Sequence, residues 1–233
     1  MQKIAIMGAM PEEVAPILEK LGTYKTTEYA GNKYYEASYK GVEIVVAYSK
    51  IGKVFSTLTA TTMIQHFGAE KLLFSGVAGA ISASLKVGDL IVATKLSQHD
   101  LDITAFGHPY GFVPEGAVFV EADKDLIALS KEVASSMGKT VVEGIIATGD
   151  QFVANEERKN WIGETFNADA LEMEGGSVAV VCNALNIPFF ILRAISDAAD
   201  MDASFSFDEF LETSAVESAE FVMKMVDKIV LPS

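Results

Sequence analysis

KIAIMGAMPEEV, residues 3–14, joins a short apolar run to a glycine turn and the start of a helix. The run from Lys3 to Gly8 predicts a buried strand, because it is short, apolar and bounded by a glycine. Pro11 suits the first position of a helix, since its φ is fixed and it has no N–H group to satisfy. Glu12 and Glu13 would then face the positive end of the helix dipole. A strand followed at once by a helix predicts an α/β fold.

The rest of the chain repeats this alternation of short Val- and Ile-rich runs with longer segments of helical periodicity. Strands that are buried on both faces and covered by helices give this pattern. We therefore predict a single α/β domain over residues 1–233, with a mixed central β-sheet flanked by α-helices. The predicted strands are Lys3 to Gly8, Lys33 to Tyr39, Glu43 to Tyr48, Lys71 to Ser75, Asp89 to Leu96, Ala117 to Val120, Val141 to Thr148, Ala168 to Leu171 and Phe189 to Ile195. The predicted helices are Pro11 to about Gly22, Lys53 to Phe67, Asp123 to Met137, Glu156 to Ile162, Glu174 to Leu185 and a last one near the C-terminus.

The last helix carries the clearest start signal, Ser206-Phe207-Asp208-Glu209. This sequence fits a capping box, in which the Ser and Glu side chains satisfy the first free N–H groups of a helix. Apolar residues recur at helical spacing from there to Ile229 and should face the sheet. The longest predicted loop runs from Gln98 to Gly116, and long loops in compact domains tend to be functional.

The composition argues against several kinds of partner. The net charge of −14 and the low pI near 4.6 disfavour nucleic acid and acidic membranes, which bind clustered Lys and Arg. The first residues predict a strand rather than a signal peptide, so we expect a cytoplasmic protein. Cys182 lies in an apolar helical segment and predicts a core thiol. The three histidines form no metal-binding pattern, and we predict neither a metal nor a cofactor.

Acidic residues follow three of the predicted strands, where α/β sheets bind their ligands. They are Glu12 and Glu13, then Glu172 and Glu174, and finally Asp197. Taken singly, each is better explained by an ordinary role at a helix end or in a turn. Together with the glycine turns at residues 8–10 and 76–80 they favour a shared pocket, which these features alone assign to no substrate.

Known phosphate-binding motifs do not explain the glycine turns. Neither turn is a GxGxxG, so a dinucleotide site is a weak alternative. Ile51-Gly52-Lys53-Val54 lacks the first glycine and the Ser or Thr of a P-loop.

Six segments together carry a more specific signal: Gly8-Ala9-Met10 with Glu12-Glu13-Val14, Ser49-Lys50-Ile51-Gly52-Lys53, Gly149-Asp150-Gln151-Phe152, Glu172-Met173-Glu174, Arg193-Ala194-Ile195-Ser196-Asp197 and Ser206-Phe207-Asp208-Glu209-Phe210-Leu211. In this order they resemble the 5′-methylthioadenosine/S-adenosylhomocysteine nucleosidase family. The resemblance runs from Met1 to about Met225. It implies the nucleoside phosphorylase/hydrolase fold, a homodimer, and hydrolysis of the N-ribosidic bond of 5′-substituted adenine nucleosides with release of adenine.

The resemblance also implies roles for matching positions. Glu13 would orient and deprotonate the attacking water, and Asp197, supported by Ser196, would protonate the purine N7. Glu174 would hold the ribose hydroxyls, with Arg193 near both Glu174 and the water. The remaining positions expected to contact substrate are Glu172, Met173 on the sugar, Phe152 stacked on adenine, Val153 at the base edge, and Met10.

The chemistry needs two carboxyl groups in different states. Cleavage of a C–N ribosidic bond leaves cationic character on the sugar and excess electron density on the purine, so a proton at N7 improves the leaving group. Burial disfavours the charged form of a carboxyl group, which would let Asp197 keep its proton. Glu13 needs the ionised form to accept a proton from water, and Glu174 would favour positive charge on the ribose.

The chain departs from the family pattern at two positions. Pro11 stands where many relatives carry an acidic residue, which should tighten the helix start. Val77 stands where other members often have serine, so a hydroxyl contact to water or ribose is absent there. Val77 and its neighbours resemble the enzymes that also hydrolyse 6-amino-6-deoxyfutalosine in menaquinone synthesis. 5′-Methylthioadenosine, S-adenosylhomocysteine and 5′-deoxyadenosine are the other expected substrates, and the sequence does not rank the four.

The loop from Gln98 to Gly116 resembles the dimer segment that gives apolar residues to the partner's 5′-group pocket. Ile103 and Phe106 stand in the matching positions, and Phe207 would close the same pocket. An ordinary packed loop is the alternative.

Two other functions remain open at this level. A purine nucleoside phosphorylase on the same fold must bind phosphate, for which Arg or several N–H donors are needed. The chain has only Arg158 and Arg193, and Glu12 and Glu13 occupy the turn that phosphate would approach. A non-catalytic nucleoside-binding protein is disfavoured because all three candidate carboxyl groups are present.

Overall fold

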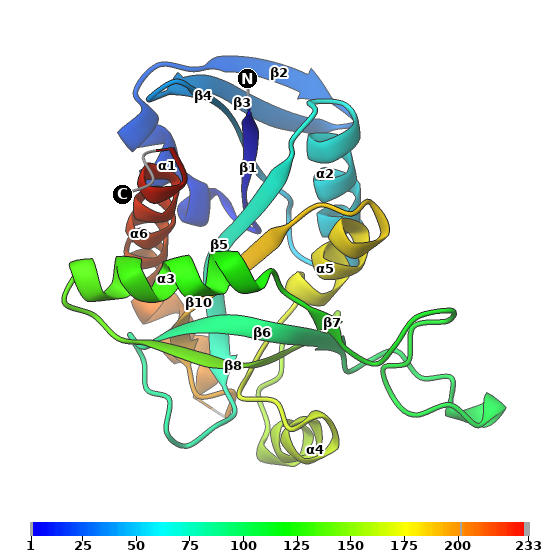
Figure 1. Ribbon diagram of the computed structural model, residues 1–233. Coiled ribbons are helices and arrows are strands. Elements are labelled where there is room, and N and C mark those ends of the chain that lie inside the picture. Colours follow the sequence, from blue (N-terminus) through cyan, green and yellow to red (C-terminus); the bar gives the residue numbers. More distant parts are fainter. Residues whose placement is uncertain (1, 201, 231–233) are drawn as a thin grey trace.

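The computed structural model describes residues 2–200 and 202–230, which build one mixed β-sheet between two layers of helices (Figure 1). The strand order is β10-β6-β8-β9-β5-β1-β4-β3-β2, with β7 paired to β6. The strands are β1 (Lys3–Gly8), β2 (Lys25–Tyr29), β3 (Asn32–Tyr39), β4 (Val42–Tyr48), β5 (Lys71–Ala80), β6 (Leu90–Gln98), β7 (Val120–Glu121), β8 (Val141–Thr148), β9 (Ala170–Glu172) and β10 (Phe189–Asp197).

The sheet closes on itself around β5. This strand pairs in parallel with β1 and β10 and antiparallel with β9. Because β10 also pairs with β6, β6 with β8, and β8 with β9, five strands form a ring, while β1, β4, β3 and β2 continue as an open sheet. The closure brings the carboxyl ends of β5, β9 and β10 together with that of β1.

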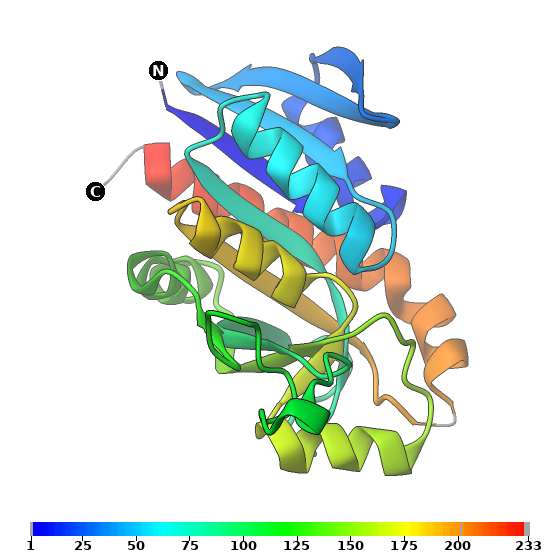
Figure 2. The same ribbon diagram turned by 90° about the vertical axis from the view of Figure 1, so that its right-hand side faces the viewer.

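Helices cover both faces of the sheet. α6 (Ala203–Val230) packs on β5 and β10 and contacts α1 (Pro11–Leu21) and α3 (Lys124–Ser136). α2 (Lys53–Gln65) and α5 (Gly175–Ala184) pack against each other on the opposite face (Figure 2). α4 (Glu156–Phe166) lies at the end of the sheet where β8 finishes. The core between these layers consists mainly of strand residues such as Ile4, Ile6, Phe74 and Ile191, none of which is exposed.

The structure agrees with the predicted α/β class, and it corrects three details. β2 is an additional strand that the sequence did not predict. In place of the strand predicted at Ala117 to Val120 the structure has the two-residue β7, which shares only Val120 with the prediction. The prediction of a capping box at Ser206 is wrong, because α6 already begins at Ala203 and the Ser206 amide donates a hydrogen bond to the carbonyl of Asp202.

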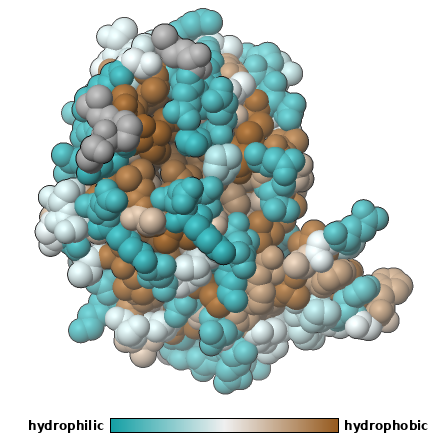
Figure 3. Space-filling model, viewed as in Figure 1, coloured by the Kyte–Doolittle hydropathy of each residue, from teal (hydrophilic) through white to brown (hydrophobic). Residues whose placement is uncertain are grey.

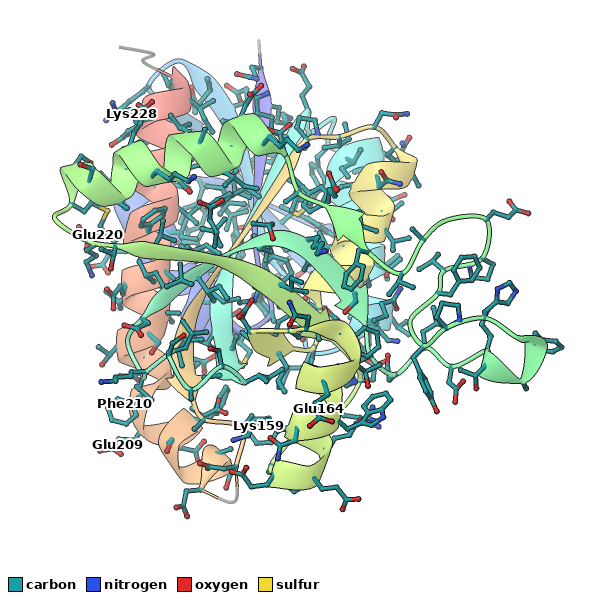
Figure 4. The ribbon with its side chains drawn as sticks, turned by 60° about the horizontal axis from the view of Figure 1, so that its bottom comes forward. Lys159, Glu164, Glu209, Phe210, Glu220 and Lys228 are labelled. Carbon is teal, nitrogen blue, oxygen red and sulfur yellow. The ribbon has the colours of Figure 1, made fainter. Side chains whose placement is uncertain are left out.

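The long loop between β6 and β7 stands out from the body of the molecule (Figure 1). It contains one short 3-10 helix, η1 (Thr104–Phe106). Figure 3 shows this arm as a projection with both apolar and polar surface. In Figure 4 its tip points away from the end of the molecule marked by Lys159 on α4 and Phe210 on α6. Another part of the arm contacts α4, where the rings of Tyr110 and Trp161 meet edge to face with their centres 5.0 Å apart.

Candidate active site

A cavity with ≈ 560 Å³ of space not filled by atoms lies at the converging strand ends. Buried carboxyl groups from three separate segments face it beside apolar and aromatic side chains. Its walls are formed by Ala9, Met10, Glu13, Ile51, Val77, Ala78, Gly79, Gln151, Phe152, Val153, Leu171, Glu172, Met173, Glu174, Ser196, Asp197 and Phe207. Most of the positions expected to contact substrate are therefore brought together.

Glu13 is held by the turn between β1 and α1. Its Oε2 atom accepts hydrogen bonds from the amides of Ala9 (2.5 Å) and Met10 (3.1 Å), and its Oε1 atom accepts one from Val77 (3.1 Å). The side chain reaches β5 only because residue 76 is glycine, where a Cβ atom would lie 2.8 Å from Glu13 Oε1. Burial raises the pKa of Glu13 despite the opposing effects of Arg193 and the three amides.

Glu172 and Arg193 form an ion pair with almost no exposure. Arg193 Nη2 lies 2.7 Å from Glu172 Oε2, and the guanidinium group also stacks on Phe74, 4.0 Å from the ring centre. Glu172 further accepts hydrogen bonds from the Thr148 hydroxyl (2.5 Å) and the Gly175 amide (2.7 Å). The partner of Arg193 is thus Glu172 rather than Glu174, and Thr148 joins this network without any motif to reveal it.

Glu174 stands immediately before α5 and points back to the start of α2. Its Oε1 atom accepts a hydrogen bond of 2.8 Å from the Gly52 amide. Burial, reinforced by the nearby charge of Glu172, raises the pKa of Glu174 to about 8. A group in this state changes its charge readily near neutral pH.

Asp197 ends β10, whereas the sequence placed it just after that strand. Its Oδ1 atom accepts a hydrogen bond from the Ala199 amide (2.8 Å), and Oδ2 accepts one from the Ser196 hydroxyl (2.9 Å). Burial raises the pKa of Asp197 in spite of these two hydrogen bonds. The carboxyl group is therefore biased toward its protonated form.

Aromatic side chains border the open side of the cavity. Phe152 and Phe207 meet edge to face, with ring centres 5.7 Å apart. Phe152 is 49 % exposed, so one of its surfaces is free to contact another flat group. Val153 beside it is buried.

Three expected site residues lie outside the cavity wall. Arg193 lies behind it, paired with Glu172. Ile103 and Phe106 belong to the projecting arm, and Phe106 is 81 % exposed. Within one chain they do not reach this cavity.

Several wall residues were not predicted as contacts. Ile51 and Gln151 belong to motifs that the sequence singled out, so their place in those motifs was the available signal. The only sequence signal for the other four wall residues was their place in a glycine turn or at a strand end; they are Ala9, Ala78, Gly79 and Leu171.

The fold and the cavity define an α/β protein of the nucleoside phosphorylase/hydrolase type. Residues 3–229 match the family model described as Phosphorylase superfamily, and the chain belongs to that family.

Individual relatives are similar over almost the whole chain. The aminodeoxyfutalosine nucleosidase of Campylobacter jejuni is 58 % identical over 98 % of this chain and 100 % of its own length. A mutant futalosine hydrolase of Helicobacter pylori strain 26695 superposes with a TM-score of 0.97 at 52 % identity, covering 98 % of this chain and 100 % of the other. A Helicobacter pylori nucleosidase mutant with 5′-methylthioadenosine in its active site gives a TM-score of 0.96 at 52 % identity, covering 98 % and 99 %. These relatives confirm the fold class and the nucleosidase family that the sequence motifs indicated.

Two features are absent from the described part of the chain. Across residues 2–200 and 202–230, no helix is long and apolar enough to cross a membrane. The same part of the chain holds no group of three or more His, Cys, Asp or Glu side chains arranged to bind a metal ion.

Proposed function

We propose that this protein hydrolyses the N-ribosidic bond of 5′-substituted adenine nucleosides and releases adenine. The observation that carries this proposal is the convergence of Glu13, Glu174 and Asp197 on one cavity. The relatives support it, since they are named an aminodeoxyfutalosine nucleosidase, a futalosine hydrolase and a nucleosidase mutant with 5′-methylthioadenosine in its active site. No cofactor is needed for this reaction.

Asp197 acts as the general acid. Its raised pKa keeps a proton available for the purine N7, and the Ser196 hydroxyl holds the carboxyl group in place. Protonation at N7 withdraws electrons from the C1′–N9 bond, which breaks with the bonding pair leaving on adenine.

Glu13 acts as the general base. A raised pKa makes its ionised form a better proton acceptor, while Arg193 and the three backbone amides preserve that ionised form. One water oxygen bonds to C1′ as N9 leaves, and the released water proton passes to Glu13. The products are adenine and the 5-substituted ribose.

The other cavity residues bind the substrate. Glu174 accepts hydrogen bonds from the ribose hydroxyls, and Met173 packs on the sugar. Phe152 stacks on adenine, and the Val153 backbone recognises the base edge. Phe207 closes the pocket for the 5′ group, and Met10 and Val77 contact the substrate beside Glu13. Glu172 holds Arg193 and the start of α5 around these groups.

The 5′-group pocket is completed by a second copy of the chain. Ile103 and Phe106 of each protomer contact the cavity of the other in this homodimer. The exposure of Phe106 supports this proposal, and so do Ile51, Val54, Phe55 and Leu58, which leave apolar surface uncovered at the start of α2. Phe106→Ala should raise KM for 5′-methylthioadenosine, whereas a fully active monomer in sedimentation would contradict the homodimer.

The substrates are 5′-methylthioadenosine, S-adenosylhomocysteine, 5′-deoxyadenosine and 6-amino-6-deoxyfutalosine. The identity of 58 % to an aminodeoxyfutalosine nucleosidase supports the last of these. A competition assay with all four nucleosides ranks them. A cytoplasmic location and the absence of nucleic-acid and membrane partners remain predictions from the sequence.

Adenine release with and without phosphate tests the reaction type. We expect equal rates and a free reducing sugar as product. A strict need for phosphate with ribose 1-phosphate as product would show a phosphorylase instead. Tight binding of 5′-methylthioadenosine without any release of adenine over hours would show a non-catalytic binding protein.

A further inference from the structure

The carboxyl group of Glu174 is positioned by one backbone amide. Gly52 N–H donates the 2.8 Å hydrogen bond to its Oε1 atom, and the described residues offer no second hydrogen bond to this carboxyl group. Gly52 has φ +101°, a conformation that favours glycine. The place of Glu174 therefore depends on what fixes the turn at Gly52.

Asp150, in the segment after β8, fixes the turn at Gly52. Gly52 precedes α2 and has no side chain with which to cap it, so the first amide of the helix, that of Lys53, donates instead to Asp150 Oδ1 at 2.7 Å. A carboxylate here also faces the positive end of the α2 dipole. Asp150 packs so closely that a Cβ atom at position 52 would lie 2.9 Å from the same Oδ1 atom.

Asp100 contacts both Lys53 and Asp150, so that the three residues form a closed ring of polar contacts. Its Oδ1 atom lies 2.6 Å from Lys53 Nζ, and its Oδ2 atom accepts a hydrogen bond of 2.8 Å from the Asp150 amide. Burial acts to raise the pKa of Asp100, but the hydrogen bonds from Lys53 and Asp150 outweigh it and lower the pKa. Lys53, Asp100 and Asp150, here called the clamp triad, thus connect α2 with the segments after β6 and β8.

We propose that the clamp triad is a positioning element that fixes the Gly52 amide against Glu174 and thereby sets where Glu174 meets the ribose. The proposal rests on the proposed function for the role of Glu174. None of the three residues lines the cavity, so they act through Gly52. Asp100 also belongs to the arm that carries Ile103 and Phe106, and Asp150 lies two residues before Phe152. The triad therefore connects the ribose end of the site with the segments for the base and for the 5′ group.

Steady-state kinetics with 5′-methylthioadenosine provide the first test. Asp150→Ala and Lys53→Met should lower kcat/KM about tenfold or more, mainly through KM, because a displaced Glu174 binds the hydroxyls poorly before and during the reaction. Asp150→Asn should stay within about threefold of wild type, since its amide oxygen still accepts from the Lys53 amide. Lys131→Met, which breaks an ion pair between Lys131 on α3 and Glu143 on β8, is the matched control and should leave both constants unchanged.

A second readout needs no turnover. In a 13C-carboxyl NMR titration, with the Glu174 signal assigned by Glu174→Gln, Asp150→Ala should raise the pKa of Glu174, because the Gly52 hydrogen bond lowers it. Lys131→Met should leave the titration unchanged. If wild type released no adenine, the proposed function would fail, and this titration would still decide the position of Glu174. Asp150→Ala and Lys53→Met variants that keep both the titration and kcat/KM within twofold of wild type would overturn the clamp triad.

Discussion

Replacing Arg193 by methionine would leave a buried carboxylate without its counter-ion. The side chains of Arg193 and Glu172 are 1 % and 3 % exposed, and their charged atoms lie 2.7 Å apart. Removing one partner of such a pair typically costs about 3–5 kcal/mol of folding free energy. Glu172 would keep its hydrogen bonds from Thr148, Gly175 and Glu174, so we expect a loss near the lower limit, about 3 kcal/mol. For a chain of this size that corresponds to a melting temperature lower by about 6–12 °C.

Thermal and urea unfolding at one fixed protein concentration measure this loss. Adding Glu172→Gln to Arg193→Met should restore at least about 1 kcal/mol, because the double variant buries no unpaired charge. Lys124→Met is the control, since it breaks an exposed pair with Glu121 and should cost less than about 1 kcal/mol. An Arg193→Met variant as stable as that control, or additive effects in the double variant, would refute the assigned ion pair.

Four further predictions concern the carboxyl groups. Asp197→Asn should fold and bind 5′-methylthioadenosine but release adenine about 10²–10⁴-fold more slowly, because the general acid is lost. Turnover at the wild-type rate would contradict the role of Asp197 as the acid. Wild-type kcat should also fall as pH rises through the raised pKa of Asp197, a profile that the Asn variant should not show. Glu13→Gln should slow single-turnover release by a similar factor, and an unchanged rate would exclude Glu13 as the base. Because the pKa of Glu174 is raised from its ordinary value of 4.5 to about 8, the folded state loses stability relative to the unfolded chain as the pH rises from 4.5 to about 8. In urea unfolding, the stability of Glu174→Gln should therefore increase relative to that of wild type across this range. A difference in stability that stays constant with pH would count against the shift.

Local signals explain where sequence-based prediction of the fold succeeded. α1 begins at Pro11 as predicted, because the restraint that proline imposes acts within one residue. β2 was missed because KTTEY is polar and lies exposed at the sheet edge, so it shows no apolar alternation. It forms through pairing with β3 across the tight turn at Ala30 and Gly31, both at positive φ. The α6 start was misplaced because a capping-box pattern also occurs inside a helix whose first turn is fixed by other contacts.

The candidate site was predictable to the extent that its residues lie in motifs. Glu13, Glu174 and Asp197 each belong to a recognisable segment and line one cavity. The clamp triad joins Lys53 to Asp100, 47 positions away, and no local spacing marks such a contact. Thr148 is likewise an ordinary strand end, and its hydroxyl group becomes important through its contacts with Glu172 and the Gly176 amide.

The convergence of the acids follows from the pairing of β5. Gly76 lies opposite Arg193 of β10, and Gly79 lies opposite both Asp197 of β10 and Leu171 of β9. Side chains at these glycines would occupy the space that Glu13 and Asp197 fill, so small residues on β5 are what allow these two carboxyl groups into one cavity. Desolvation then raises the pKa of each, and the folded state carries that cost when no substrate is bound. A substrate that supplies hydroxyl donors to Glu174 and a basic nitrogen to Asp197 offsets part of this cost. The groups that make the empty site unfavourable therefore favour binding of a nucleoside over binding of an apolar ligand of equal size.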